Sequence, residues 1–209
     1  MLKTIYISIR VSINSSYIDE ICYDIYSLFK NNAISMAIER PSCNRVVIVG
    51  KNFEVKFFVS PTSKSIIGIA LEVNDDILKD TKNFLNNILL QLNKILFKKS
   101  IVDENIKLGI HTTLKIDQIN IEDLIQKLFT LSVVLDKTEN KNVEGFPIVV
   151  IKGNIIGYDL RKYDITIAIL ASEEIELSIA IETNIYIDKI FNAINYINNL
   201  INIITEAII

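Results

Sequence analysis

Two segments of the chain alternate apolar and polar residues with a period of two. Isoleucine or valine occupies every second position of residues 5–13, and residues 106–116 show a similar alternation. Successive side chains of a strand point to opposite faces, so each segment predicts a strand with one buried face.

Each predicted strand is followed by a segment with helical spacing of its apolar residues. The first runs from Ile18 to Phe29 and the second from Ile121 to Leu128. Ser15 or Ser16 precedes the first segment, Asn120 precedes the second, and both begin with acidic residues. Such residues cap helix N-termini and complement the helix dipole, so both segments are predicted helices.

Further strands and one long helix complete each half. After irregular stretches at about 39–45 and 136–147, the expected strands are 45–50, 53–60 and 65–73 in the first half, and 148–153, 163–171 and 175–183 in the second. Asn74 and Asn184 are the expected first residues of the two long helices, each with an apolar stripe. The connections between consecutive strands have hairpin lengths, which favours antiparallel pairing.

The order strand, helix, roughly four strands, long helix therefore occurs twice. We expect an α+β fold in which two pseudo-symmetric β-α-β4-α repeats, 1–100 and 101–209, form one curved antiparallel sheet with helices on one face. The segment Phe97–Glu104 is the expected junction.

Composition narrows the class of protein. Half of the 209 residues are hydrophobic, 22% are charged, and there are only 6 glycines and 3 prolines, which is typical of a folded protein. The net charge of -3 gives no overall attraction to nucleic acid or to an anionic membrane. Polar residues interrupt every dense apolar region, so we expect no membrane-spanning helix and a cytoplasmic location.

Residues that carry catalysis or bind metals are scarce. His111 is the only histidine, and Cys22 and Cys43 lack the spacing of metal ligands. We expect a buried thiol at Cys22 and an incidental thiol at Cys43, with a disulfide as the less favoured alternative. His111 is expected to face solvent or a partner. The glycines form no phosphate-binding loop. The sequence therefore predicts no enzymatic activity, no cofactor and no metal site.

Several local motifs accompany the repeated order of elements. Asn105 and Ile106 open the second repeat, Phe146 and Pro147 precede a strand, and Lys152 follows. The first repeat has Phe57-Phe58-Val59-Ser60, then Lys64 and Gly68. With its duplicated unit, the chain resembles the TATA-box-binding protein family. The resemblance implies a saddle formed by two such repeats, whose concave sheet sits on the DNA minor groove.

The sequence departs from that family where DNA would bind. Minor-groove binding of that kind needs apolar wedges and basic residues that contact phosphates. Phe146, Phe58 and Leu170 are candidate wedges, but nothing near Cys43 fits the fourth position. Four acidic residues stand where the family has neutral or basic ones: Glu72, Glu173, Glu174 and Glu182. These departures disfavour nucleic acid.

The leading hypothesis is a non-enzymatic binding protein that engages a protein partner, or a second copy of itself, through its sheet face. Nucleic acid is the disfavoured partner. The candidate partner-binding residues are Phe58, Lys64, Asn105, Phe146, Lys152 and Leu170. The alternative is a helix-grip-like carrier of a small apolar ligand, because a long helix on a curved sheet also describes that class. A fold whose loops or long helices cover both sheet faces stays open.

Overall fold

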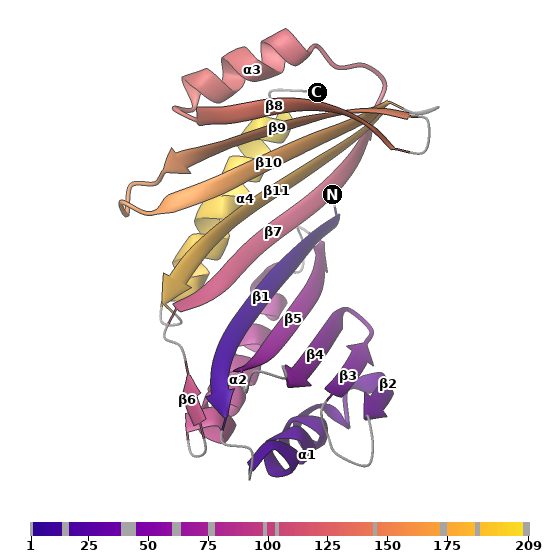
Figure 1. Ribbon diagram of the computed structural model, residues 1–209, viewed down its shortest axis with the longest axis vertical. Helices are drawn as coiled ribbons and strands as arrows, with labels where there is room; N and C mark the ends of the chain where they lie inside the picture. Colours follow the sequence, from indigo (N-terminus) through magenta and orange to yellow (C-terminus); the bar gives the residue numbers. More distant parts are fainter. Residues whose placement is uncertain are drawn as a thin grey trace. The chain divides into compact units, whose positions relative to one another are not determined.

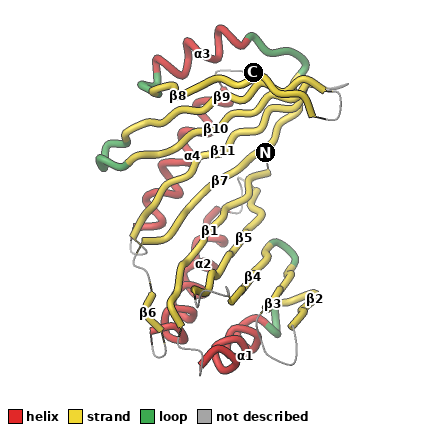
Figure 2. Tube along the Cα trace, viewed as in Figure 1, coloured by secondary structure: helices red, strands yellow, loops and turns green. Residues whose placement is uncertain are grey.

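Figures 1 and 2 show the computed structural model, which describes residues 2–13, 17–38, 45–59, 64–74, 78–97, 100–102, 105–143, 146–171, 175–186 and 189–206. The strands are β1 (Leu2–Ile13), β2 (Ala33–Ile38), β3 (Arg45–Gly50), β4 (Phe53–Val59), β5 (Lys64–Asn74), β6 (Ser100–Val102), β7 (Asn105–Ile116), β8 (Val134–Val143), β9 (Phe146–Ile156), β10 (Lys162–Ala171) and β11 (Ile175–Tyr186). The helices are α1 (Ile18–Phe29), α2 (Leu78–Phe97), α3 (Ile121–Thr130) and α4 (Ile190–Glu206).

The chain divides into two compact units. The N-terminal unit comprises Thr4–Leu108 with Asn184–Asp188, and the C-terminal unit comprises Met1–Lys3, Gly109–Thr183 and Lys189–Ile209. Within the N-terminal unit the strands follow the order β2-β3-β4-β5-β1, and β6 pairs with β1. Within the C-terminal unit the order is β7-β11-β10-β9-β8.

The order of elements is the same in both halves of the chain. A strand, a helix, four strands and a second helix run from β1 to α2, and the same series runs from β7 to α4. Strands that follow one another in each run of four pair antiparallel. The predicted α+β class with antiparallel sheet and helices is therefore confirmed.

Alternating burial defines the core of the C-terminal unit. One face of β10 and β11 consists of aliphatic side chains that are at most 4% exposed: Ile165, Ile167, Ile169, Leu177, Ile179 and Ile181. Figure 1 shows α4 lying against this sheet. The apolar stripe of α4 is buried as well, and Ile197 and Ile201 have no exposed surface. Each fully buried isoleucine contributes about 1.5–3 kcal/mol relative to an exposed one.

Strand β8 corrects one expectation. The stretch at about 136–147 was expected to be irregular, yet residues up to Val143 continue a strand that pairs with β9 along its length. Its side chains are mostly polar on both faces, because β8 is the last strand of its sheet and buries little of either face. An apolar alternation is therefore missing. The earlier irregular stretch, residues 39–44, lies outside the described residues.

The beginnings of the helices correct further expectations. Asn120 caps α3 as predicted, because its Oδ1 accepts hydrogen bonds from the backbone N–H groups of Glu122 and Asp123. Asn184 does not begin a helix but lies within β11, and Asn74 is the last residue of β5. Strand β11 continues past Asn184 to Tyr186, and β5 includes Asn74 as its last residue.

Two more expectations concern α1 and the junction. The residue before α1 is Tyr17, which makes no side-chain cap, and Ser15 and Ser16 lie outside the described residues. The expected junction begins with the last residue of α2 and includes a short strand, β6, that pairs with β1.

Cys22 differs from its prediction. It is fully buried on α1, as expected, but it is disulfide-bonded rather than a free thiol. The chain has one other cysteine, Cys43, which lies outside the described residues. No helix in the described part of the chain is both long and apolar enough to cross a membrane.

Candidate functional site

The second face of the C-terminal sheet differs from the face that lies against α4. We call it the outer face and define it by nine residues of β9, β10 and β11: Ile148, Val150, Lys152, Thr166, Ala168, Leu170, Glu176, Ser178 and Ala180. The register places them in three rows across the strands. All nine are half-buried rather than buried. Their rows run Lys152–Thr166–Ala180, Val150–Ala168–Ser178 and Ile148–Leu170–Glu176.

The middle of the outer face is apolar. Val150 and Ala168 are direct partners, and Ile148 and Leu170 are direct partners two positions further along. Cross-strand neighbours on one face lie about 4.5–5.5 Å apart, so these four side chains form a continuous strip.

Paired charges border this strip on β8. Glu139 lies opposite Val150 and accepts a hydrogen bond from Lys137, while Lys141 Nζ lies 2.8 Å from its Oε2 atom. The hydrogen bonds from Lys137 and Lys141 lower the pKa of Glu139 to about 2. The three side chains form a ladder of alternating charge that is neutralised internally except for one positive charge.

His111 and Ser178 meet on the same side of the sheet. His111 lies on β7, and its Nε2 atom is 2.6 Å from the Ser178 Oγ atom, with donor and acceptor set by the tautomer. Burial lowers the pKa of His111, so the ring is neutral at pH 7. The expectation that His111 faces solvent or a partner agrees with its half-buried position.

The structure brings three of the sequence-predicted residues together on one side of one sheet. Phe146, Lys152 and Leu170 occupy alternate positions of β9 and β10 on the outer side, and Phe146 is 44% exposed. Phe58 lies on β4 of the N-terminal unit, where the Arg45 guanidinium carbon lies 5.1 Å from its ring centroid. The side chains of Lys64 and Asn105 lie outside the described residues.

The structure describes the side chain of one of the four acidic residues that disfavour nucleic acid, Glu182. Glu182 is exposed on β11, and a Cβ atom added at Gly109 would lie 3.3 Å from its Cγ atom. Glu182 therefore lies beside β7 on the outer side. Glu173 and Glu174 lie outside the described residues, as does the side chain of Glu72.

A buried lysine was not foreseen. Lys3 is 3% exposed, and its Nζ atom donates hydrogen bonds to Asn198 Oδ1 at 2.5 Å and Asn202 Oδ1 at 2.7 Å. Two features of the sequence place these side chains on the faces that meet. Lys3 is in phase with the buried isoleucines of β1, and the two asparagines are four residues apart on one face of α4. Only the tertiary arrangement joins them, which makes Lys3 a polar anchor for α4.

The hairpin between β9 and β10 carries exposed apolar residues. Tyr158 is exposed, and Leu160 is 86% exposed with a φ of 61°. The turn is held below its tip, where the Tyr163 hydroxyl donates to Asp159 Oδ2 at 3.1 Å and the Tyr163 ring lies 4.7 Å from that of Tyr196. Burial raises the pKa of Tyr163, so its hydroxyl stays protonated as a donor.

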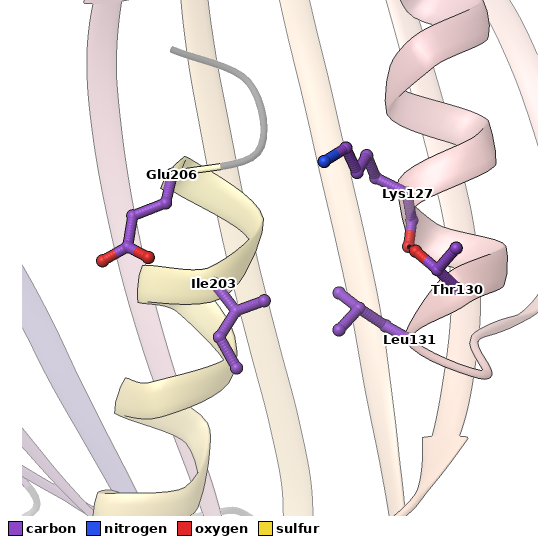
Figure 3. A pocket seen from close by; sticks show the side chains of 5 residues that line it. All are labelled: Lys127, Thr130, Leu131, Ile203 and Glu206. Atoms are coloured by element: carbon purple, nitrogen blue, oxygen red, sulfur yellow. Dashed lines mark hydrogen bonds between the residues drawn. The ribbon is translucent and has the colours of Figure 1, made fainter.

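A groove separates α3 from α4. It has a volume of about 320 Å³ and is open to solvent, and Figure 3 shows its lining residues Lys127, Thr130, Leu131, Ile203 and Glu206. Two of these residues are apolar and two are charged. Among the described residues, no group of three or more His, Cys, Asp or Glu could hold a metal ion.

Comparisons with known proteins add little. No protein-family model matches the chain, and no curated protein matches it significantly. Among solved structures, the chain is similar to the di-domain ARO/CYC BexL from the BE-7585A biosynthetic pathway, at 8% identity and a TM-score of 0.25, over 91% of this chain and 88% of that chain. Likeness at this level carries no inference about function.

Proposed function

We propose that this protein is a non-enzymatic binding protein that holds a protein partner on the outer face of its C-terminal sheet. Its fold, in this proposal, is a duplicated repeat like that of the TATA-box-binding protein family, which the repeated order of elements supports. The observation that carries the proposal is the half-buried apolar strip bordered by charges that are already paired.

The strip has the anatomy of a protein interface. Interfaces between proteins have an apolar centre and a polar rim, and charged residues are depleted at their centre. Val150, Ala168, Ile148 and Leu170 form such a centre, and Phe146 adds an exposed aromatic ring at the end of β9. Aromatic side chains at interface positions supply large contact area and often dominate binding.

The charge balance disfavours nucleic acid. Lys137, Lys141 and Lys152 lie on the outer side of the sheet, but Glu139, Glu176 and Glu182 lie there too. Binding to phosphates depends on an excess of lysine and arginine that releases counterions. A balanced face lacks that excess, so the fold does not bring the DNA binding of the family it resembles.

The neighbouring Ser178 and His111 do not favour hydrolysis. A serine nucleophile needs backbone N–H donors placed where the oxyanion develops, as well as a base. Ser178 lies in the middle of β11, opposite Ala168 of β10. Backbone groups in the middle of a sheet are used by the ladder. We therefore assign the pair a role in holding β7 to β11.

Site-directed photocrosslinking tests this proposal. The variant Ala168→p-benzoylphenylalanine places a photoreactive group in the strip, and Glu122→p-benzoylphenylalanine places it on the exposed side of α3 as a control. We expect a discrete protein adduct from position 168 alone, and its loss when Val150→Lys is added. Adducts at both positions, or at position 122 alone, contradict the proposal.

A duplex titration tests the nucleic-acid alternative. Labelled AT-rich and GC-rich duplexes are titrated at low and moderate salt. We expect weak binding without base preference that disappears at moderate salt, because few lysines are unpaired on this face. Submicromolar binding that prefers the AT-rich duplex would show that DNA is the partner.

The ligand-carrier alternative rests on the groove between α3 and α4. In this reading an apolar molecule lies against Leu131 and Ile203. Among the described residues, the side chains on the sheet face against α4 and those on the apolar stripe of α4 are buried. If a fluorescent apolar probe binds the wild-type chain, and Leu131→Glu abolishes this binding while Ala168→Lys does not, the carrier is favoured.

The cytoplasmic location stays a prediction.

A further inference from the structure

The two charged residues of the outer face have no ionic partner among the described residues. Lys152 lies on β9 and Glu176 lies on β11, and neither makes a hydrogen bond or an ion pair with another described side chain. On the neighbouring strand β8, by contrast, Lys137 and Lys141 are already paired with Glu139. Lys152 and Glu176 are therefore the charges that a partner on the outer face can pair with.

These two charges occupy opposite corners of the outer face. Lys152 lies in the row of Thr166, and Glu176 lies in the row of Leu170. Two strand spacings and four residues along a strand separate them, which corresponds to about 16 Å in a regular sheet. Ala168, at the centre of the face, lies on the diagonal that joins them.

The diagonal separates side chains of different size. The larger apolar ones lie on one side of it: Ile148, Val150 and Leu170. The smaller ones lie on the other side: Thr166, Ser178 and Ala180. A rod-shaped segment along the diagonal can bury apolar side chains against the first group and place bulky ones over the second, which gives the shape complementarity of an interface core.

The outer face offers a partner side chains but no backbone groups. Strands β9, β10 and β11 each have a neighbouring strand on both sides. An extended segment on this face would bury its own N–H and C=O groups without partners, at a cost in free energy. An α-helix pairs these groups internally and presents side chains alone. The face therefore favours a helix over an extended peptide.

We propose that the partner contributes an amphipathic α-helix that lies along this diagonal, with a basic residue near Glu176 and an acidic residue near Lys152. The proposal rests on the proposed function, because the helix is the part of the protein partner that the outer face holds. About eleven residues of helix, or three turns, span about 16 Å. Apolar residues at helical spacing between the two charges then cover Ala168.

Fluorescence anisotropy with a labelled helical peptide tests this proposal. The probe is a blocked peptide of about 14 residues of leucine, alanine and glutamine, with a lysine at one end of its leucine stripe and a glutamate at the other. A hydrocarbon staple on the face opposite the leucines keeps it helical, because isolated helices of this length are marginal in water. Matched peptides carry two lysines, two glutamates, or a central proline in place of the staple.

We expect the lysine–glutamate peptide to bind the wild-type chain at least about threefold more tightly than either like-charged peptide, because each like charge replaces an attraction by a repulsion. The proline peptide should lose binding, because proline breaks the helix. In Glu176→Lys both corners are basic, so the two-glutamate peptide should become the tightest, a gain that a misfolded variant cannot give. Glu122→Lys on the exposed side of α3 is the matched control and should keep the wild-type order of affinities.

Three results would overturn the proposal: equal affinity for all stapled peptides, undiminished binding of the proline peptide, or a Glu176→Lys protein that keeps the wild-type order. If no peptide binds below about 1 mM, the helix is also wrong, but a protein adduct from position 168 still supports the proposed function. Absence of both the adduct and peptide binding contradicts the proposed function as well.

Discussion

The two faces of the C-terminal sheet use the same strands for different purposes. On β10, Ile165, Ile167 and Ile169 face α4 and are buried, whereas Thr166 and Ala168 between them are half-buried on the outer face. The buried face is mainly aliphatic, which suits a core that excludes water. The outer face mixes small, apolar and charged residues, which suits the proposed binding surface.

The largest expected effect lies on the buried face. Ile167→Ala should lower the free energy of unfolding by about 2–5 kcal/mol, because it leaves a cavity in a fully buried site. The neighbouring Thr166→Ala on the outer face should cost less than about 1 kcal/mol. Urea unfolding of both variants measures the difference. Equal losses would show that the outer face is also part of the core.

The second expected effect lies at the buried lysine that contacts α4. Lys3→Met leaves the Asn198 and Asn202 amide oxygens without their donor, so it should cost about 1–3 kcal/mol. Adding Asn198→Leu and Asn202→Leu removes the two acceptors that have lost their donor, and it should recover much of the lost free energy of unfolding. Thermal or urea unfolding compares the variants. A triple variant less stable than Lys3→Met would contradict this account.

The local pattern predicted the two faces well. Alternation placed Ile5, Ile7 and Ile9 on a buried face. The resemblance, not the alternation, selected Phe146, Lys152 and Leu170, and the register places all three on the outer side. The local pattern failed where local signals conflict: Asn184 resembles a helix start, but the alternation of Ile181, Thr183 and Ile185 continues through it, and all three are buried.

Features that depend on tertiary contact could not be predicted. The Lys3 anchor joins residues 195 and 199 positions apart in sequence. No period of a single strand or helix specifies such a meeting. The groove between α3 and α4 has the same origin, because its lining comes from the ends of two separate helices. Strand β8 was missed for a different reason, since an edge strand needs no apolar alternation.

A smaller effect is expected at His111 and should depend on pH. Burial lowers its pKa, so below the ordinary value of about 6.5 the unfolded chain binds a proton before the folded chain does. The stability contribution is present above that pH and is lost as pH falls toward the lower folded pKa. His111→Gln removes the titration. The free energy of unfolding of His111→Gln, relative to that of wild type, should therefore increase as the pH falls from about 7 to about 5.

Urea unfolding at several pH values measures this difference, and the other titrating groups cancel between the two proteins. A constant difference would show that His111 titrates alike in the folded and unfolded states. Ser178→Ala serves as the companion variant, because it removes the hydroxyl and leaves the ring. It should keep the pH dependence that His111→Gln abolishes.

The smallest effect is expected at the ladder on β8. The hydrogen bonds from Lys137 and Lys141 lower the pKa of Glu139 to about 2. A carboxylate with a lowered pKa contributes stability above its ordinary value of about 4.3 and loses it as pH falls toward the folded value. The side chains of Lys137 and Lys141 are more than half exposed and that of Glu139 is 23% exposed, so the contribution is small and screened by salt. Glu139→Gln should be slightly less stable than wild type at neutral pH and low salt. Thermal unfolding measures this difference, which should disappear in high salt or as the pH falls from about 4 toward about 2. If Glu139→Gln stays less stable than wild type under both conditions, Glu139 acts through packing of its side chain against Val150 rather than through its charge. The ladder would then lie within the apolar strip instead of at its border.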